Sequence, residues 1–203
     1  KGTPNGKVTV NIRGGKIVNT YAGGNKTEVG EPVINFYGGV TENGYGGGNQ
    51  AKVNVSHVLL DGGKVNNLFG SSNLSGDVST SNVVVSSGIG ENIYGGNNIG
   101  GTTNISNVNI NGGEINNVYG GGRETDISTS SNVNIMGSAT NVFGGSDKSG
   151  NVKTSYINVN DGVVTNIYGG NNLGGKTNTS NVTVNGGIIG SLYGGGLEAF
   201  TTT

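Results

Sequence analysis

Short runs of alternating apolar and polar residues recur along the chain at a nearly constant spacing. In the clearest runs a serine is followed at every second position by two aliphatic residues, as in Ser56-Val58-Leu60 and Ser106-Val108-Ile110. Alternation with a period of two predicts a β-strand with one buried face. The unit returns at Ser81, Ser131, Ser155 and Ser180, so that the steps between successive serines are nearly equal.

A second apolar run follows each serine unit after a glycine-bearing turn, and it ends in an aromatic ring followed by glycine. The rings are Tyr21, Tyr45, Phe69, Tyr94, Tyr119, Phe143, Tyr168 and Tyr193. Two positions before the ring stands Asn19, Asn43, Asn67, Asn92, Asn117, Asn141 or Asn166, and the last copy has Ser191 there. A third, weaker run precedes each serine. A fixed period of this length is the signature of a repeat architecture.

Two or three short strands joined by glycine corners, repeated every ~25 residues, predict one coil of a parallel β-solenoid. We expect an all-β fold: a single-stranded parallel β-helix of about eight coils, formed by residues 1–203 as one domain. An irregular coil is expected near residues 25–44, where Pro32 and an additional Phe36-Tyr37-Gly38-Gly39 interrupt the pattern.

A longer period is superimposed on the coil repeat. Tyr45, Tyr119 and Tyr193 are each followed by three glycines and are equally spaced, three coils apart, which indicates a three-coil super-repeat. Solenoids need atypical polar caps at their ends, and neither Lys1 nor Thr203 lies in such a segment. The chain is therefore expected to be a fragment of a longer array.

The pattern also predicts which side chains point inward. The serines and the aliphatic residues of the first run share one face of a strand, which we expect to be buried. In the second run Val65 and Leu68 are three positions apart, so burying both requires a bend. We assign the bend to the intervening asparagine, which tolerates left-handed geometry. The aliphatic residue before each ring then faces inward, and the ring faces outward or lies at the corner.

The recurring asparagines and rings are candidates for structural ladders. Identical amides stacked at strand spacing can hydrogen-bond from coil to coil, so the asparagine column is interpreted as structural. The aromatic column has two open interpretations. Stacked rings ordinarily cover neighbouring glycines and stiffen a sheet, whereas exposed rings would form a ligand-binding column that stacks against sugars.

Composition narrows the classes of partner. The 43 glycines of the 203 residues are typical of low complexity, but valine and isoleucine follow the period, which argues against disorder. The net charge is −1 and no basic run could follow a phosphate backbone, so nucleic acid is not an expected partner. No stretch approaches the roughly 20 apolar residues of a membrane helix.

Metal and cofactor chemistry is not expected either. The chain has no cysteine, which excludes disulfides and thiolate metal sites. The segment from Gly95 to Thr102 has the glycines of a calcium-binding repeat but no acidic residue to supply the ligand. We therefore predict no metal and no cofactor.

Catalytic candidates are few. His57 is the only histidine and takes the place of an outward asparagine in its repeat, so it is interpreted as a surface residue. Glu42 and Glu91 both lie three positions before their rings, two coils or ~9.6 Å apart at strand spacing. That separation is slightly above the range of inverting glycosidases, and Asn66 lies between them. We predict that the protein is not an enzyme.

The units Ser-Asn-Val-Asn-Ile-Asn-Gly-Gly (106–113) and Ile-Asn-Asn-Val-Tyr-Gly-Gly-Gly (115–122), with their copies, carry a resemblance in style and period. The chain resembles the glycine-, asparagine- and serine-rich β-solenoid repeat region of bacterial surface adhesins. This resemblance implies an extracellular or cell-surface stalk or adhesin with no residue-level site to transfer.

The expected partners are surface glycans, surface proteins, or the same protein through coil ends or polar faces. The alternative is a polysaccharide-active β-helix enzyme, a lyase or a glycoside hydrolase, which a carboxylate cluster in a groove would favour. An ice-binding surface is a third hypothesis. It would need a flat threonine array, and Thr102-Thr103 and Thr177-Asn178-Thr179 recur only in alternate units.

Overall fold

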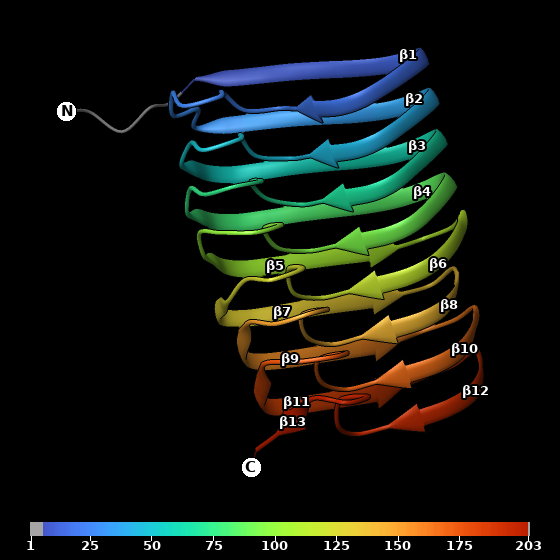
Figure 1. Cartoon of the computed structure of the whole chain (residues 1–203). Coiled ribbons are helices and arrows are strands. Elements are labelled where there is room, and N and C mark those ends of the chain that lie inside the picture. Colours follow the sequence, from blue (N-terminus) through green and yellow to red (C-terminus); the bar gives the residue numbers. More distant parts are fainter. Residues whose placement is uncertain (1–5, 203) are drawn as a thin grey trace.

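The computed structural model describes residues 6–202 and shows a stack of parallel coils without a helix (Figure 1). The predicted all-β, parallel β-solenoid of about eight coils is confirmed. Of the predicted domain 1–203, residues 1–5 and 203 lie outside the described range, and with them Lys1 and Thr203, for which a missing cap was noted.

Each coil has two arms that meet at a glycine corner. In the first four coils both arms belong to one bent strand: β1 (Lys7–Tyr21), β2 (Glu31–Tyr45), β3 (Val53–Phe69) and β4 (Val78–Tyr94). From the fifth coil the strand is interrupted at the corner. The arms are then β5 (Thr103–Ile110) and β6 (Glu114–Tyr119), β7 (Ile127–Ile135) and β8 (Ser138–Phe143), β9 (Asn151–Val159) and β10 (Val163–Tyr168), and β11 (Lys176–Val184) and β12 (Ile188–Tyr193), with the short β13 (Phe200–Thr201) after them.

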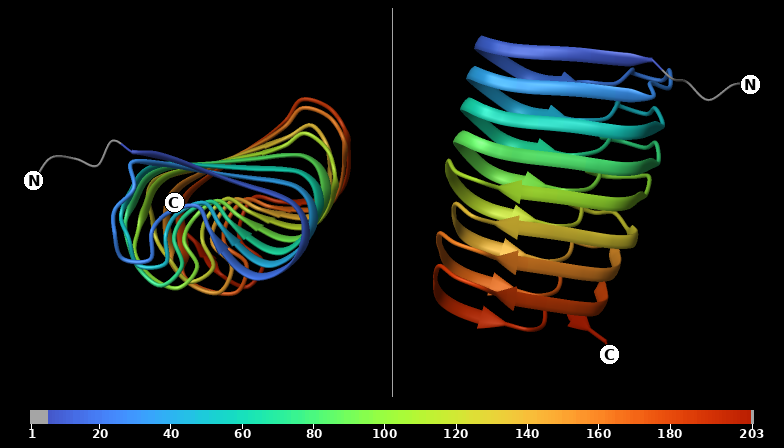
Figure 2. Two further views of the ribbon diagram at one scale, coloured as in Figure 1. Left: turned by 90° about the horizontal axis from the view of Figure 1, so that it is seen from above. Right: turned by 180° about the vertical axis from the view of Figure 1, so that it is seen from behind.

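Successive coils pair in parallel, and equivalent residues of the repeat lie beside one another. Between β4 and the next coil, Ser81 pairs with Ser106, Val83 with Val108, and Tyr94 with Tyr119. Seen from above, the coils superpose with a gradual displacement from one end to the other (Figure 2). Each recurring side chain therefore stacks on its own copies.

The main core fills the space between the two arms. In the third coil it receives Val58 and Leu60 from the first arm, and Val65 and Leu68 from the second; all four are at most 3% exposed. The corresponding aliphatic residues of the neighbouring coils belong to the same continuous cluster. The apolar positions that the alternation marks as inward are thus the core of the solenoid.

The corners between the arms are made by glycine, as the repeat pattern predicts, but the left-handed bend expected at an asparagine of the second arm is not found. Gly63, Gly88 and Gly113 have φ angles of 73°, 91° and 88°, whereas no non-glycine residue among the described ones has a positive φ. The second arm still buries both Val65 and Leu68, so it bends without left-handed geometry at an asparagine. Glycine takes the corner because only it adopts positive φ without strain.

The segment near residues 25–44, expected to be irregular, is regular from Glu31 onward. Strand β2 pairs with both of its neighbours, and Phe36 lies beside Ile12 and Leu60 of the adjacent coils. Its ring is 1% exposed in the main core, so it is a core residue and not an additional ring of the aromatic column. Gly39, with φ of 80°, makes the usual corner.

The inward serines connect the first arm to the turn that follows the ring. Ser56 donates to the carbonyl of Gly70 at 2.5 Å, and Ser106 donates to that of Gly120 at 2.5 Å. Ser81, Ser131 and Ser155 donate in the same way to Gly95, Gly144 and Gly169. Because these serines are fully buried, the hydroxyl replaces the water that the glycine carbonyl would otherwise need.

We predict that Ser81→Ala lowers the free energy of unfolding by about 1–3 kcal/mol, because the buried carbonyl of Gly95 loses its donor. The matched control is Ser79→Ala in the same strand, where the side chain is exposed, and it should change stability by less than about 0.5 kcal/mol. Urea unfolding followed by circular dichroism measures both. Equal effects of the two substitutions would contradict the assigned role of the serine column.

Candidate functional site

The eight predicted rings form one stack along the solenoid. Successive ring centroids are 4.6–5.0 Å apart and the ring planes are within 5–9° of parallel. Strands of one sheet lie about 4.7–4.9 Å apart, so pairing in register brings equivalent rings to stacking distance. The column is therefore a direct consequence of the coil repeat.

Most of the rings are shielded from solvent, which agrees with the interpretation of the column as a stack that stiffens the sheet and not with exposed rings. Tyr45, Phe69, Tyr94, Tyr119 and Phe143 form a second buried cluster, at most 5% exposed, against which Tyr21 and Tyr168 pack. Only Tyr193, in the last coil, is half exposed at 51%. Within the stack each ring face is covered by the next ring, so the buried rings offer no free face to a sugar.

A glycine directly follows each ring from Tyr45 to Tyr193, whereas Ala22 follows Tyr21. The turn at this position leads into the loop that covers the ring edge. A side chain at Gly95 would collide with the carbonyl of Gly120, and one at Gly120 would collide with the carbonyl of Gly144. Glycine is required because the turns of adjacent coils approach at backbone contact distance.

One amide ladder runs beside the rings, formed by the asparagines two positions before them. The Nδ2 of each asparagine donates to the Oδ1 of the asparagine one coil earlier, at 2.9–3.0 Å. The members are Asn19, Asn43, Asn67, Asn92, Asn117, Asn141 and Asn166. We call this row the strand ladder.

A second row, which the sequence analysis missed, lies in the loops that cover the rings. Asn49, Asn73 and Asn98 each donate to the preceding member of the row, at 2.8–2.9 Å, and the first acceptor is Asn25. The row continues through Arg123 and Asp147 to Asn172. We call it the loop ladder. The sequence contains a signal for this row, because a polar loop residue, often asparagine, recurs once per coil. The residues around the loop asparagines, however, vary more than those around the asparagines before the rings.

The tyrosine hydroxyls meet the loop ladder two coils further along the chain. Asn73 donates to the hydroxyl of Tyr21 at 3.2 Å, and Asn98 donates to that of Tyr45 at 3.4 Å. Tyr94 instead donates its hydroxyl to the carboxylate of Asp147 at 3.1 Å. Ring column and loop ladder are therefore one hydrogen-bonded layer.

A polar groove of about 270 Å³ opens between the two ladders. The strand ladder forms one wall, the loop ladder forms the other, and ring edges form the floor. We define the polar groove by its lining residues: Asn43, Asn67, Phe69, Asn92, Tyr94, Asn98, Arg123, Asp147 and Lys148.

The charged side chains of the groove differ in their exposure to solvent and in their hydrogen bonds. Asp147 is 7% exposed, and its two carboxylate oxygens accept hydrogen bonds from Tyr94 and Asn172. Arg123 and Lys148 are more open, with side chains 35% and 46% exposed. Both lie 3.9 Å from Glu124, which is an ion pair at the outer limit of distance.

Burial controls the acidity of the tyrosines in this layer. It raises the pKa of Tyr45 to about 12, with the neighbouring Tyr21 as a smaller cause. Burial also raises the pKa of Tyr94 and of Tyr119, further than that of Tyr45, and the carboxylate of Asp147 adds to both shifts. These hydroxyls are therefore neutral donors and acceptors at physiological pH.

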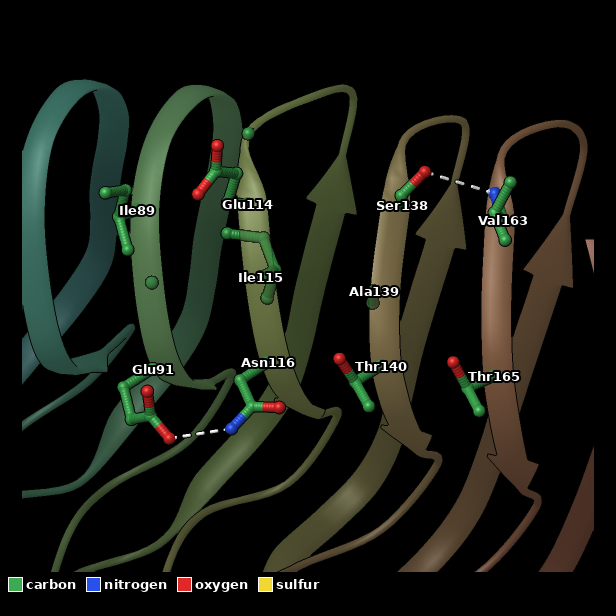
Figure 3. A pocket seen from close by; sticks show the side chains of 12 residues that line it. Ile89, Glu91, Glu114, Ile115, Asn116, Ser138, Ala139, Thr140, Val163 and Thr165 are labelled. Atoms are coloured by element: carbon green, nitrogen blue, oxygen red, sulfur yellow. Dashed lines mark hydrogen bonds between the residues drawn. The ribbon is translucent and has the colours of Figure 1, made fainter.

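A larger, open hollow of about 470 Å³ lies on the second arms of the fourth to seventh coils (Figure 3). In this region Gly90 and Ala139 pair with Ile115 and Val164 of neighbouring coils, and Ile89, Glu91, Glu114 and Val163 are among the residues that line the hollow. Glu91 lines it and accepts a hydrogen bond from Asn116 at 2.7 Å, as Figure 3 shows.

The carboxylates of the candidate catalytic pair, Glu42 and Glu91, each accept a hydrogen bond from an asparagine of the following coil. Glu42 accepts from Asn66 of the next coil at 3.2 Å, in the same way that Glu91 accepts from Asn116 of the coil after its own. Asn66 lies in the coil between them, and only Glu91 lines the hollow. Each carboxylate therefore acts as an acceptor in a short side-chain ladder.

His57 lines a separate hollow of about 260 Å³ together with amide and aliphatic side chains. In the strand pairing it lies beside Asn82, in agreement with its place in an outward asparagine row. Within residues 6–202 no three histidine or acidic side chains gather as they would around a metal ion. Over the same range no helix is long and apolar enough to cross a membrane.

Comparison of the chain with protein families, with characterised proteins and with solved structures finds no match.

We predict that Tyr45, Tyr94 and Tyr119 remain protonated in the folded protein at pH 11. Their pKa values lie above the value of about 10 in an unfolded chain. Their contribution to stability is therefore fully present below pH 10 and is lost as the pH rises through 12 and beyond.

Tyrosinate absorbance, recorded together with circular dichroism, tests this expectation. In Tyr45→Phe the step assigned to a pKa of about 12 should disappear. Ionisation of all eight tyrosines near pH 10, in a protein that is still folded, would refute the buried column.

Proposed function

We propose that this chain is a non-enzymatic module of a cell-surface or secreted protein, a rigid stalk that also carries adhesive contacts. The observation that carries the proposal is the continuous axial layer of stacked rings and two amide ladders. It joins every coil to the next by side chains as well as by backbone.

The geometry of the layer suits a spacer. Each coil adds one strand spacing, so eight coils span roughly 38 Å at ~4.8 Å per coil. In a solenoid every repeat is stabilised by its neighbours, and length can be changed by adding repeats without redesigning a core. Stalks of surface proteins need this property.

The polar groups support a binding role better than a catalytic one. The carboxylates that we considered for catalysis, Glu42 and Glu91, each hold an asparagine of the following coil. The amide rows, in contrast, repeat uncharged donors and acceptors along the surface. Hydroxyl-rich ligands such as glycans match donors and acceptors of this kind.

The purified protein is expected to bind glycans on an array, or to associate with itself in a homotypic aggregation assay, without degrading any glycan. Both contacts would arise from the polar faces, because the buried rings are not accessible. Negative results in both assays would reduce the protein to a pure spacer and contradict the adhesive part of the proposal.

The double variant Glu42→Gln/Glu91→Gln separates this function from a polysaccharide-active β-helix enzyme. Glutamine keeps the oxygen that accepts from Asn66 and Asn116, so the fold should be retained with a change below about 0.5 kcal/mol. We expect no glycan cleavage above the blank in either protein. Cleavage by the wild type that the double variant loses would favour the enzyme.

A further inference from the structure

The loop ladder departs from asparagine at the polar groove. Arg123 occupies the place that Asn49, Asn73 and Asn98 hold in the preceding coils, and its backbone makes the corresponding hydrogen bond to the earlier loop. The ring two coils before Arg123 is Phe69, which lines the groove together with Tyr94 and has no hydroxyl to bond to an amide.

The three-coil super-repeat does not by itself explain why Arg123 occurs together with Phe69. Phe143 lies one three-coil super-repeat after Phe69, and the loop residue at the same interval after Arg123 is Leu197. Leu197 makes the same backbone hydrogen bond as Arg123 does, 3.0 Å long in both loops, but its side chain carries no donor. A phenylalanine in the column therefore tolerates an apolar loop residue, and the guanidinium of Arg123 is specific to this groove.

The cations of the groove keep most of their hydrogen-bonding capacity. Arg123 has five N–H donors, and within the described residues it makes one long hydrogen bond, 3.4 Å to Asn98. Its contact with Glu124, and that of Lys148, are 3.9 Å and thus beyond hydrogen-bond distance.

The single carboxylate of the groove is turned inward. Both oxygens of Asp147 are occupied, by Tyr94 and by Asn172, and the side chain is buried. A ligand that enters from solvent therefore meets the donors of Arg123 and Lys148, with the partly exposed Glu124 3.9 Å from both, before it meets Asp147.

The opposite wall offers neutral groups. Asn67 and Asn92 each donate one N–H to the previous coil and accept one hydrogen bond from the next. An amide has two N–H groups and two lone pairs, so one of each remains for a ligand. Hydroxyl groups, which donate and accept, complement this row.

We propose that the polar groove binds an acidic saccharide, a sugar residue that carries a carboxylate. The carboxylate is held by Arg123 and Lys148, and the hydroxyls are held by Asn67 and Asn92. A planar guanidinium matches a carboxylate with two parallel hydrogen bonds. The volume of about 270 Å³ is slightly below the range of drug-sized pockets and suits one sugar residue of a longer chain. This inference rests on the proposed adhesive function and specifies its ligand.

The test compares binding of oligosaccharides that contain hexuronic acid with binding of the same oligosaccharides after methyl esterification, by titration calorimetry. The variants are Arg123→Asn and Lys148→Gln. Arg123→Asn places the residue of the other coils in the loop ladder, so it removes the charge while preserving the local hydrogen-bond pattern. The control is Lys153→Gln, an exposed lysine of β9 outside the groove.

The wild type and Lys153→Gln should bind the acid form with equal affinity. Arg123→Asn should weaken binding by about tenfold or more, the usual effect of losing a charge-assisted hydrogen bond. Lys148→Gln should weaken it less, since an ammonium lacks the paired geometry. Esterification should weaken binding to the wild type and change little for Arg123→Asn, and added salt should weaken binding of the acid form.

Three results would overturn the inference in different ways. Equal binding of acid and ester by the wild type would refute the acidic ligand. Binding that Arg123→Asn and Lys148→Gln leave unchanged would place the glycan site elsewhere while the adhesive function stands. Absence of binding to any glycan by a folded wild type, verified by circular dichroism, would refute the inference, and the aggregation assay would then decide the adhesive function separately.

Discussion

Parallel pairing of equivalent residues, one coil apart, is the constraint on which the rest of this structure depends. It places Tyr94 on Tyr119 and Asn92 on Asn117, so whatever recurs in the sequence becomes a column in space. Stacked rings and amide ladders then form without any further structural requirement, because the distances that favour ring stacking and amide hydrogen bonds match the spacing of adjacent strands. The same constraint favours glycine where the turns of two coils approach most closely, as at Gly95 and Gly120.

The interior of the protein consists of two buried clusters, the aliphatic core and the ring column, which contribute differently to the structure. The aliphatic core lies between the arms and buries their apolar side chains. The ring column lies under the loops, where it separates buried apolar side chains from the polar loop ladder. Tyrosine hydroxyls end at the loop ladder, and buried serines satisfy the turn carbonyls. A substitution in a loop can therefore change the surface chemistry while the core keeps its form, as Arg123 and Asp147 do in the loop ladder.

Much of the fold could be predicted because the signals were periodic. The serine units, the inward aliphatics and the coil length all follow from alternation and spacing, and each needs only strand geometry to interpret. The exposure of the rings was left open by the sequence. Alternation assigns Leu68 and Phe69 to opposite faces of a strand, but the loop that follows covers the second face, and both residues are buried.

The coil, its length and the columns follow from the repeat, since stacking of identical residues requires no information beyond it. Which residues of different coils share a site depends on how the coils pack in three dimensions. Phe69, Asn92, Arg123 and Lys148 come from four successive coils and meet because each loop covers a ring two coils earlier in the chain. That offset depends on how the turns pack on one another, and no local pattern in the sequence encodes it.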